Sequence, residues 1–283
     1  MRLSALSMFW QTTRNTIDLT RPRVMGIVNV TPDSFSDGGK HADTRTALVH
    51  CEQLLAEGAD ILDIGGESTR PGAEPVSLAD ELARVLPVLE GALTLGCPIS
   101  LDTLKPEVMK QALAMGVDII NDINALRSPG AAEAVAAHQS CGVCLMHMRG
   151  APKTMQQDPE YDDVVAEVSD FLRERFEALQ AMGVAAGRIV FDPGIGFGKS
   201  VEHNIELLRR QRELLALGRP LLVGWSRKST LGAITGRPAT ERLPASVAAA
   251  LAAVQSGAHI VRVHDVAATV DALKVWHAAG LGQ

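Results

Sequence analysis

Eight short runs rich in Val, Ile, Leu and Met recur along the 283-residue sequence, and segments with apolar residues at helical spacing separate most of them. Strands that alternate with helices require right-handed crossovers and a mainly parallel sheet, either a closed barrel or an open doubly wound sheet. Eight such units favour the closed form, an α/β protein with a single (β/α)8 barrel. The runs begin at Val24, Ile61, Pro98, Ile119, Gly142, Arg188, Pro220 and His259.

Four segments between these runs have the helical pattern most clearly, and each ends next to a glycine that we interpret as a helix C-cap. They cover residues 44–57, 78–95, 106–115 and 161–182. No Gly-, Ser- or Pro-rich linker and no block of charge divides the chain. We therefore expect one barrel domain over residues 21–283, preceded by an N-terminal extension over residues 1–20.

Composition limits both the core and the partners of this chain. Hydrophobic residues make up 46% of the sequence but aromatic residues only 4%, so aliphatic side chains must fill the core, which suits buried parallel strands. A formal net charge of −6 leaves no basic excess for nucleic acid or an anionic membrane, although local cations could hold a small anion. Residues 1–19 lack the apolar segment of a signal peptide, and no apolar run approaches the roughly 20 residues of a spanning helix. We expect a cytoplasmic protein.

Polar residues follow the apolar runs at their C-terminal ends, unit after unit. A single Asp in such a place is more often a helix cap than a catalytic group. In a barrel, however, the C-terminal ends of all strands meet on one face, so these residues would surround one cavity. The set predicts an active site and consists of Asn29, residues 67–70, Asp102, Asn121, His147, Asp192, residues 226–228, Arg262 and His264.

The glycine-rich segment from Asp192 to Ser200 invites comparison with nucleotide-binding loops, and it matches neither template. A Walker A loop needs glycine where Pro193 stands, and a dinucleotide fingerprint needs glycine where Lys199 stands. We interpret the segment as a flexible strand-to-helix loop whose backbone can approach a flat or anionic ligand, with Asp192 facing that ligand.

Two other polar loops, residues 31–39 and residues 67–72, follow neighbouring strands. The first combines turn residues, two carboxylates and two glycines, and the second places a hydroxyl and a guanidinium before a rigid proline, which suits an anion. We predict that both are mobile lids over the cavity.

Four cysteines include the pair Cys141 and Cys144, which has metal-site or redox spacing. A zinc ribbon needs a second pair, and this pair opens an apolar strand-like run. We expect both thiols to be core packing.

Four segments resemble dihydropteroate synthases: residues 25–39 (MGIVNVTPDSFSDGG), 63–72 (DIGGESTRPG), 192–199 (DPGIGFGK) and 226–229 (SRKS). The resemblance runs in family order from about Val24 to Asp265. It implies a TIM barrel that condenses 6-hydroxymethyl-7,8-dihydropterin diphosphate with 4-aminobenzoate, giving 7,8-dihydropteroate and diphosphate for folate synthesis. It also implies Mg²⁺ as cofactor, a dissociative, cation-like intermediate and a homodimer.

The same resemblance implies a role for each site residue. A pterin edge alternates donors and acceptors, which carboxylates and amides can pair with. The pterin residues are Asp102, Asn121, Asp192 and Lys228; the diphosphate residues are Asn29, Thr69, Arg262 and His264; the 4-aminobenzoate residues are Phe35, Arg70, Pro71, Phe197 and Ser229. Asp102, Asp192, Lys228, Arg262 and His264 form the catalytic set. Asn29 and Asp37 supply the oxygen ligands that Mg²⁺ prefers.

Three positions, His41, Arg149 and Trp225, depart from the family pattern and affect packing near the first loop and the pocket floor, hence inhibitor affinity rather than reaction type. One alternative is a pterin-binding barrel that transfers methyl groups from methyltetrahydrofolate to a corrinoid protein, which should lack the two lid loops. Another is a catalytically silent regulatory or assembly subunit. The retained polar set argues against the second.

Overall fold

The computed structural model describes residues 8–30, 39–68, 73–150 and 154–281, with the backbone alone for residues 39–43. Eight parallel strands lie side by side in the order β8, β7, β6, β5, β4, β3, β10, β9, and a parallel bridge between Phe191 and Leu221 joins the two ends of the sheet. The sheet is therefore a closed barrel, which confirms the predicted fold. The strands are β3 Arg23–Asn29, β4 Ile61–Gly65, β5 Ile99–Asp102, β6 Ile119–Asp122, β7 Gly142–Met146, β8 Ile189–Asp192, β9 Leu222–Val223 and β10 Ile260–Val263.

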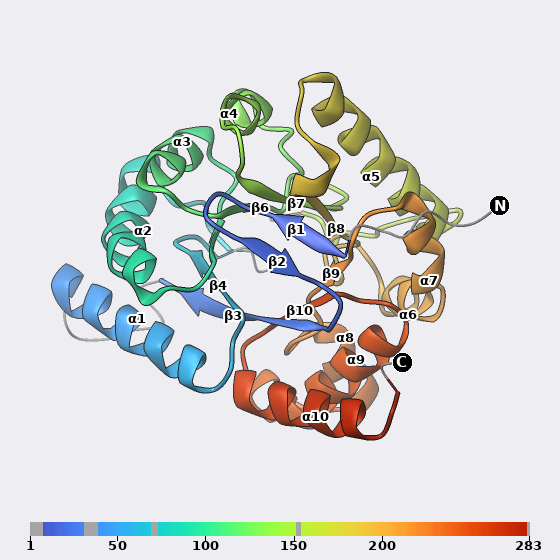
Figure 1. The fold of residues 1–283 in the computed structure, drawn as a ribbon. Coiled ribbons are helices and arrows are strands. Elements are labelled where there is room, and N and C mark those ends of the chain that lie inside the picture. Colours follow the sequence, from blue (N-terminus) through green and yellow to red (C-terminus); the bar gives the residue numbers. More distant parts are fainter. Residues whose placement is uncertain (1–7, 31–38, 69–72, 151–153, 282–283) are drawn as a thin grey trace.

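Helices surround the barrel as an outer ring (Figure 1). Side chains that favour helix N-termini begin several of them: Ser77 caps α2, Asp163 caps α5 and Ser200 caps α6 by accepting bonds from backbone N–H groups. The described helices are α1 Gly39–Ala56, α2 Leu78–Ala92, α3 Pro106–Met115, α4 Ala131–Ala137, α5 Val164–Ala181, α6 Val201–Arg209, α7 Gln211–Leu214, α8 Ser229–Thr235, α9 Leu243–Gln255 and α10 Val266–Ala278. None of them is long and apolar enough to cross a lipid bilayer.

Aliphatic side chains fill the space between strands and helices, as the composition predicts, and a second apolar cluster fills the N-terminal half of the barrel interior. Cys144 belongs to this second cluster and Cys141 is also buried. Burial raises the pKa of both thiols, so they remain in the protonated form that packs among apolar groups.

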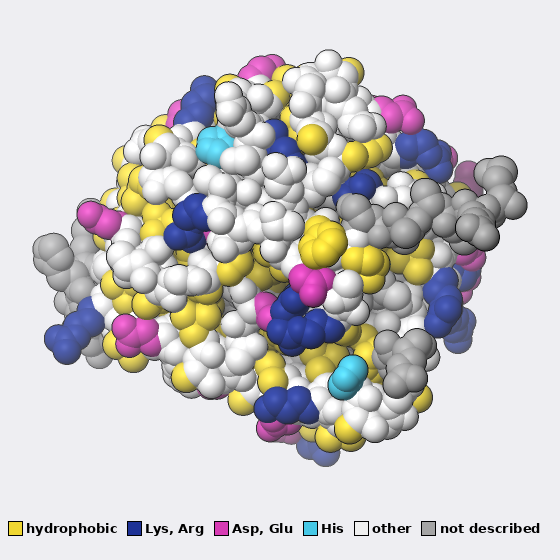
Figure 2. Space-filling model, in the orientation of Figure 1, with side chains coloured by type: hydrophobic (Ala, Val, Ile, Leu, Met, Phe, Trp, Pro, Cys, Tyr) yellow, Lys and Arg dark blue, Asp and Glu magenta, His cyan; other side chains and the backbone are white. Residues whose placement is uncertain are grey.

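An N-terminal hairpin closes one end of the barrel. Strands β1 Phe9–Gln11 and β2 Thr16–Asp18 pair antiparallel and cross the N-terminal ends of the barrel strands (Figure 1). Trp10 is fully buried, and its Nε1 donates to the carbonyl of Arg188 at 2.8 Å. Charged side chains of both signs are scattered over this face (Figure 2). The described part of the predicted N-terminal extension is therefore packed into the barrel end.

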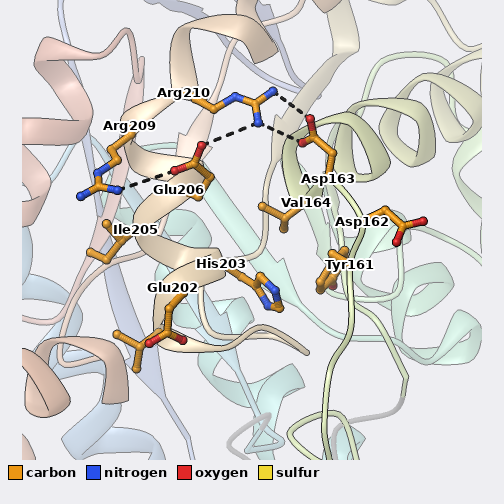
Figure 3. Close-up of a pocket in the computed structure, with 11 residues that line it drawn as sticks. Tyr161, Asp162, Asp163, Val164, Glu202, His203, Ile205, Glu206, Arg209 and Arg210 are labelled. Atoms are coloured by element: carbon orange, nitrogen blue, oxygen red, sulfur yellow. Dashed lines mark hydrogen bonds and ion pairs between the residues drawn. The ribbon is translucent and has the colours of Figure 1, made fainter.

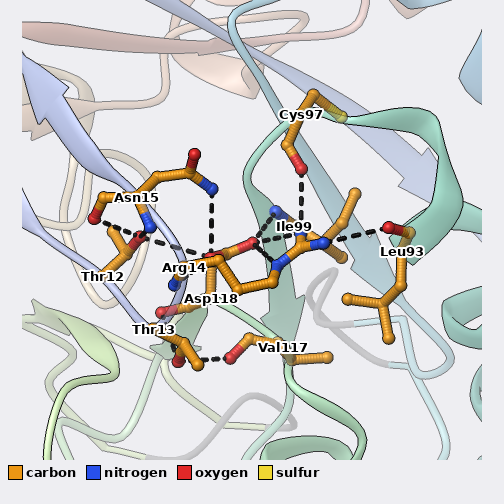
Figure 4. Close-up of polar contacts among 9 residues, drawn as sticks. All are labelled: Thr12, Thr13, Arg14, Asn15, Leu93, Cys97, Ile99, Val117 and Asp118. Atoms are coloured by element: carbon orange, nitrogen blue, oxygen red, sulfur yellow. Dashed lines mark hydrogen bonds and ion pairs between the residues drawn. The ribbon is translucent and has the colours of Figure 1, made fainter.

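Asp118 anchors the turn of this hairpin (Figure 4). Its carboxylate is fully buried and accepts bonds from the backbone N–H and the guanidinium of Arg14 and from the N–H of Ile99. Arg14 also donates to the carbonyls of Leu93 and Cys97 at 2.9 and 3.0 Å. With this end held shut, the C-terminal ends of the strands form the face that remains for a site.

Candidate active site

Strand register brings the predicted residues to one level of the barrel. Asn29 pairs with Gly65, Gly65 with Asp102, and Asp102 with Asn121, so polar residues of β3, β5 and β6 lie in register, with Gly65 of β4 between the first two. Asp192 ends β8 in the same way, beside Met146 of β7. Asp102, Asn121 and Asp192 are buried and Asn29 is half-buried. Residues far apart in the sequence thus lie together at the C-terminal ends of the strands, which we call the rim.

Arg262 of β10 forms ion pairs with two carboxylates, on β4 and on β5. Its Nη2 lies 2.7 Å from Oδ2 of Asp102 and its Nε lies 2.6 Å from Oδ2 of Asp63. Nδ2 of Asn121 donates to the same oxygen of Asp63 at 3.2 Å. The result is a chain of charge-assisted hydrogen bonds across the barrel interior.

Asp63 was not among the predicted site residues. It is completely buried in β4, and its Oδ1 has no hydrogen-bond partner within the described part of the chain. The sequence does contain a signal, because an acidic residue between aliphatic neighbours of a core strand must find a partner or lose its charge. The partner, Arg262, lies too far along the chain for any local pattern to indicate it.

Burial and neighbouring charges shift the pKa values of the rim residues. Burial raises the pKa of Asp102 to about 7, against the effect of Arg262. Burial raises the pKa of Asp192 to about 6, while the N–H of Gly194 and the charge of Lys228 oppose this rise. Burial, reinforced by Arg262, lowers the pKa of Lys228 to about 8. Although burial opposes it, the carboxylates of Asp63 and Asp102 raise the pKa of Arg262. Such mutually perturbed groups are typical of functional sites.

The segment after β9 is bound to the segment after β10. Oγ of Ser226 lies 3.0 Å from Nδ1 of His264 and accepts a bond from the His264 backbone N–H at 3.1 Å. Arg227, whose φ of 59° is uncommon for a residue with a side chain, pairs with Asp265 at 2.6 Å. These contacts place Lys228 at the N-cap of α8, directly before Ser229.

The glycine-rich loop after Asp192 makes close backbone and side-chain contacts with its surroundings. Gly194 has a left-handed φ of 68°, and a Cβ at this position would lie 1.8 Å from the carbonyl oxygen of His147. The Gly194 N–H donates to Asp192 at 2.7 Å. Nζ of Lys228 lies 4.1 Å from the centre of the Phe197 ring, a cation–π contact. The loop therefore joins a predicted pterin residue to a predicted 4-aminobenzoate residue.

Several predictions lie outside the described residues. They are the roles of Phe35, Asp37, Thr69, Arg70 and Pro71, the mobility of both lids, and the side chain of His41. Of the other two departures from the family pattern, Trp225 is buried in the main core. Arg149 lies over the ring of Tyr161 at 4.4 Å and pairs with Glu167 at 3.1 Å, so it extends toward α5.

The Mg²⁺ prediction can be tested against the donors at the rim. The side-chain amide of Asn29 has no hydrogen-bond partner among the described residues, so its oxygen is available at the end of β3. No group of three His, Cys, Asp or Glu side chains suited to a metal occurs in residues 8–30, 44–68, 73–150 and 154–281. Mg²⁺ commonly takes one or two protein ligands and completes its shell with water and substrate phosphates, so Asn29 fits this mode.

A separate hollow of about 580 Å³ lies on the outer surface, between the start of α5 and α6 (Figure 3). Arg210 forms two bonds of 3.1 Å with Asp163 across it. Tyr161, which lines the hollow, donates to the carbonyl of Gly198 at 2.8 Å. None of the predicted substrate residues lines it, so the strand-end rim and not this hollow is the candidate active site.

The fold and the cluster of carboxylates, amides and cations at the strand ends define a barrel enzyme of the pterin-binding class. The family model for pterin binding enzymes matches residues 25–264. A dihydropteroate synthase from Neisseria meningitidis serogroup B is 58% identical over 278 residues, which cover 96% of this chain and 98% of that protein. The chain belongs to the dihydropteroate synthase family.

Two solved structures agree with this assignment. Dihydropteroate synthase from Xanthomonas albilineans, solved with 4-aminobenzoic acid, has a TM-score of 0.88 and 54% identity, covering 94% of this chain and 95% of that chain. The Burkholderia cenocepacia enzyme complexed with 7,8-dihydropteroate has a TM-score of 0.89 and 52% identity, covering 98% of both chains. This relationship favours the synthase over the methyltransferase and over the catalytically silent barrel.

Proposed function

We propose that this chain condenses 6-hydroxymethyl-7,8-dihydropterin diphosphate with 4-aminobenzoate to form 7,8-dihydropteroate and diphosphate. The observation that carries the proposal is the buried set of Asp102, Asn121 and Asp192 beside Lys228 and Arg262, in a chain of this family. The solved relatives with 4-aminobenzoic acid and with 7,8-dihydropteroate support the choice of one substrate and of the product.

The pterin ring is held by carboxylate and amide groups. Asp102 and Asn121 are direct neighbours across β5 and β6, and Asp192 faces the same interior from β8. Ionised carboxylates accept N–H bonds from the pyrimidine edge, and the amide of Asn121 offers both a donor and an acceptor. Losing one such buried partner costs on the order of 1 to 3 kcal/mol, enough to weaken binding strongly.

The reacting carbon becomes positive when diphosphate leaves. The carboxylates of Asp102 and Asp192 stabilise that positive charge, while the guanidinium of Arg262 and the ring of His264 bind the departing diphosphate together with Thr69. The cationic environment of Lys228 and Arg262 keeps Asp192 more acidic than its burial alone would allow. The amine of 4-aminobenzoate then attacks the carbon and loses one proton.

We place 4-aminobenzoate between the glycine-rich loop and α8. The ring of Phe197 packs against its face, and the hydroxyl of Ser229, the first residue of α8, meets its carboxylate. Phe35, Arg70 and Pro71 complete this pocket in the proposal. Mg²⁺, held by Asn29 and Asp37, would neutralise diphosphate charge. Asn29 would bind it through the amide oxygen.

Isothermal calorimetry and a turnover assay test the proposal. We expect one molecule of diphosphate released for each 7,8-dihydropteroate formed, with turnover requiring both substrates and Mg²⁺. Release without the arylamine, or no release at all, would contradict it. A homodimer in the cytoplasm remains part of the proposal, and sedimentation of the purified chain tests the dimer.

A further inference from the structure

Lys199 is a buried cation with no part in the chemistry above. Only 3% of its surface is exposed, although it lies in the loop that carries Phe197. Its Nζ lies 2.9 Å from the carbonyl oxygen of Gly194, 3.0 Å from that of Phe197 and 2.9 Å from Nδ1 of His147. A fourth acceptor, the carbonyl oxygen of His147, lies farther away at 3.4 Å. An ammonium group has three N–H donors, one for each of the three nearer acceptors.

The ring of His147, which contacts Lys199, is held in place by its own neighbours. Burial, together with the charge of Lys199, lowers the pKa of His147 to about 2, so the ring is neutral and can accept at Nδ1. Its backbone N–H donates to the carbonyl of Asp192 at 2.9 Å, and its ring packs edge-on against Phe171. The acceptor is therefore attached to the ends of both β7 and β8.

The protonation state of Lys199 is linked to the tautomer of His147. Burial lowers the pKa of Lys199 to about 7, and the carboxylate of Asp192 opposes that change. The ammonium form donates to all three near acceptors when Nδ1 of His147 carries no proton. A neutral amine would instead accept from a protonated Nδ1, and in both forms Lys199 has donors for the carbonyls of Gly194 and Phe197.

The loop is pressed against the residues that follow β7. A Cβ at Gly198 would lie 2.4 Å from the carbonyl oxygen of Arg149, so only glycine permits this approach. Other side chains hold the remaining turns: Gln156 donates to the carbonyl of Gly196 at 2.6 Å, and Asn204 accepts from the N–H of Gly196 at 2.8 Å. Lys199 is the side chain that binds the carbonyl of Phe197, while the Phe197 N–H donates to the carbonyl of Gly194 at 3.1 Å.

We propose that Lys199 is a positioning residue: its ammonium fixes the glycine-rich loop to the end of β7 and so keeps the Phe197 ring against Lys228, where the two substrate pockets meet. The inference rests on the proposed roles of Phe197 and Lys228. Lys199 touches neither substrate; it acts through the backbone of Phe197. Loss of the ammonium would let the ring shift, and small displacements of positioning groups have large effects on turnover.

The test compares Lys199→Met with a matched control, Arg188→Met. Arg188 is equally buried and donates to the carbonyls of Cys141 and Val135 at 2.7 and 3.1 Å, but it lies at the closed end of the barrel. In the full chain, Lys199→Met should raise the KM for 4-aminobenzoate about tenfold and lower kcat by a similar factor. Arg188→Met should lower Tm and leave both constants within about twofold.

Unchanged kinetic constants in folded Lys199→Met, with only a lower Tm, would overturn the inference. If that variant does not fold, Lys199→Gln, which retains two donors, is measured in the same way and decides by the same criterion. Phe197→Ala separates the two proposals. A raised KM in Phe197→Ala with a normal KM in the lysine variants refutes the role of Lys199 alone; a normal KM in Phe197→Ala refutes the pocket assignment as well.

Discussion

Asp63 and Arg262 are 199 residues apart in the sequence, yet Oδ2 of Asp63 lies 2.6 Å from Nε of Arg262 inside the barrel. Nε of Arg262 pairs with Asp63 and Nη2 with Asp102, so the guanidinium divides its donors between two carboxylates. Asp63 thereby limits how strongly Arg262 can engage Asp102, a carboxylate that binds the pterin in our proposal. The pair connects the diphosphate side of the proposed site to its pterin side.

Replacing Asp63 by Ala should therefore weaken pterin binding without touching the pterin. Arg262 would be free to bind Asp102 with both nitrogens, and we expect the Kd for the dihydropterin diphosphate to rise about tenfold. The free energy of unfolding should fall by about 2 to 3 kcal/mol, since Arg262 keeps one carboxylate and is 23% exposed. Calorimetry and urea unfolding measure the two effects. The control is Asp170→Ala, which breaks an exposed ion pair with Arg173. An unaltered Kd for the dihydropterin diphosphate in Asp63→Ala would contradict the role of Asp63 in pterin binding.

Asp192→Asn should abolish pterin binding while making the empty protein more stable near neutral pH. Burial raises the pKa of Asp192 to about 6, above its usual value, so the folded chain holds a proton that the unfolded chain releases. The wild type should thus lose stability, relative to the variant, as pH rises from about 4 to about 6, by on the order of 1 to 3 kcal/mol. Urea unfolding of both proteins at several pH values measures this difference. A difference that does not change with pH would refute it.

Removal of Mg²⁺ with EDTA should stop turnover and leave the fold intact. Asn29 is the described residue suited to hold the ion, so Asn29→Ala should raise the Mg²⁺ concentration needed for half-maximal activity about tenfold. Binding of the dihydropterin without its diphosphate serves as the control and should be unaffected. A wild-type Mg²⁺ dependence in Asn29→Ala would remove this residue from the metal site.

Asp118→Ala should destabilise the protein and spare its chemistry. The change leaves Arg14 and the N–H of Ile99 without their buried carboxylate, and the free energy of unfolding should fall by about 3 kcal/mol. At a temperature where the variant is folded, kcat and both KM values should match the wild type, because Asp118 lies at the closed end. A changed KM in a sample that is fully folded would contradict this prediction, because it would show that the N-terminal end of the barrel affects the site at the other end.

The fold could be predicted from the sequence because the alternation of strand and helix is a local pattern repeated eight times. The rim followed from the same pattern, since strand ends converge once the barrel closes. The sequence marks Asp63 as an acidic residue in a core strand but does not identify its partner, because only closure of the whole barrel brings Arg262 near. In the sequence, Lys199 is a mismatch to nucleotide-binding motifs and the last residue of a segment that resembles the family, and neither observation indicates its contacts. Most of its acceptors are backbone carbonyls, which the residue types of the loop do not indicate.

The N-terminal hairpin was harder to foresee for a different reason. Its strands have three residues each, too short for an alternating pattern, and the contacts that hold it, such as Trp10 with Arg188, join distant parts of the chain. The roles of Phe35, Asp37, Thr69, Arg70 and Pro71 stay predictions.

Because the hairpin closes the N-terminal end of the barrel, both substrates should enter from the C-terminal ends of the strands. If the pterin binds to the carboxylates deep in the barrel and 4-aminobenzoate binds nearer the open face, the pterin must bind first. High concentrations of 4-aminobenzoate should then slow the turnover of the free enzyme by obstructing the path of its co-substrate.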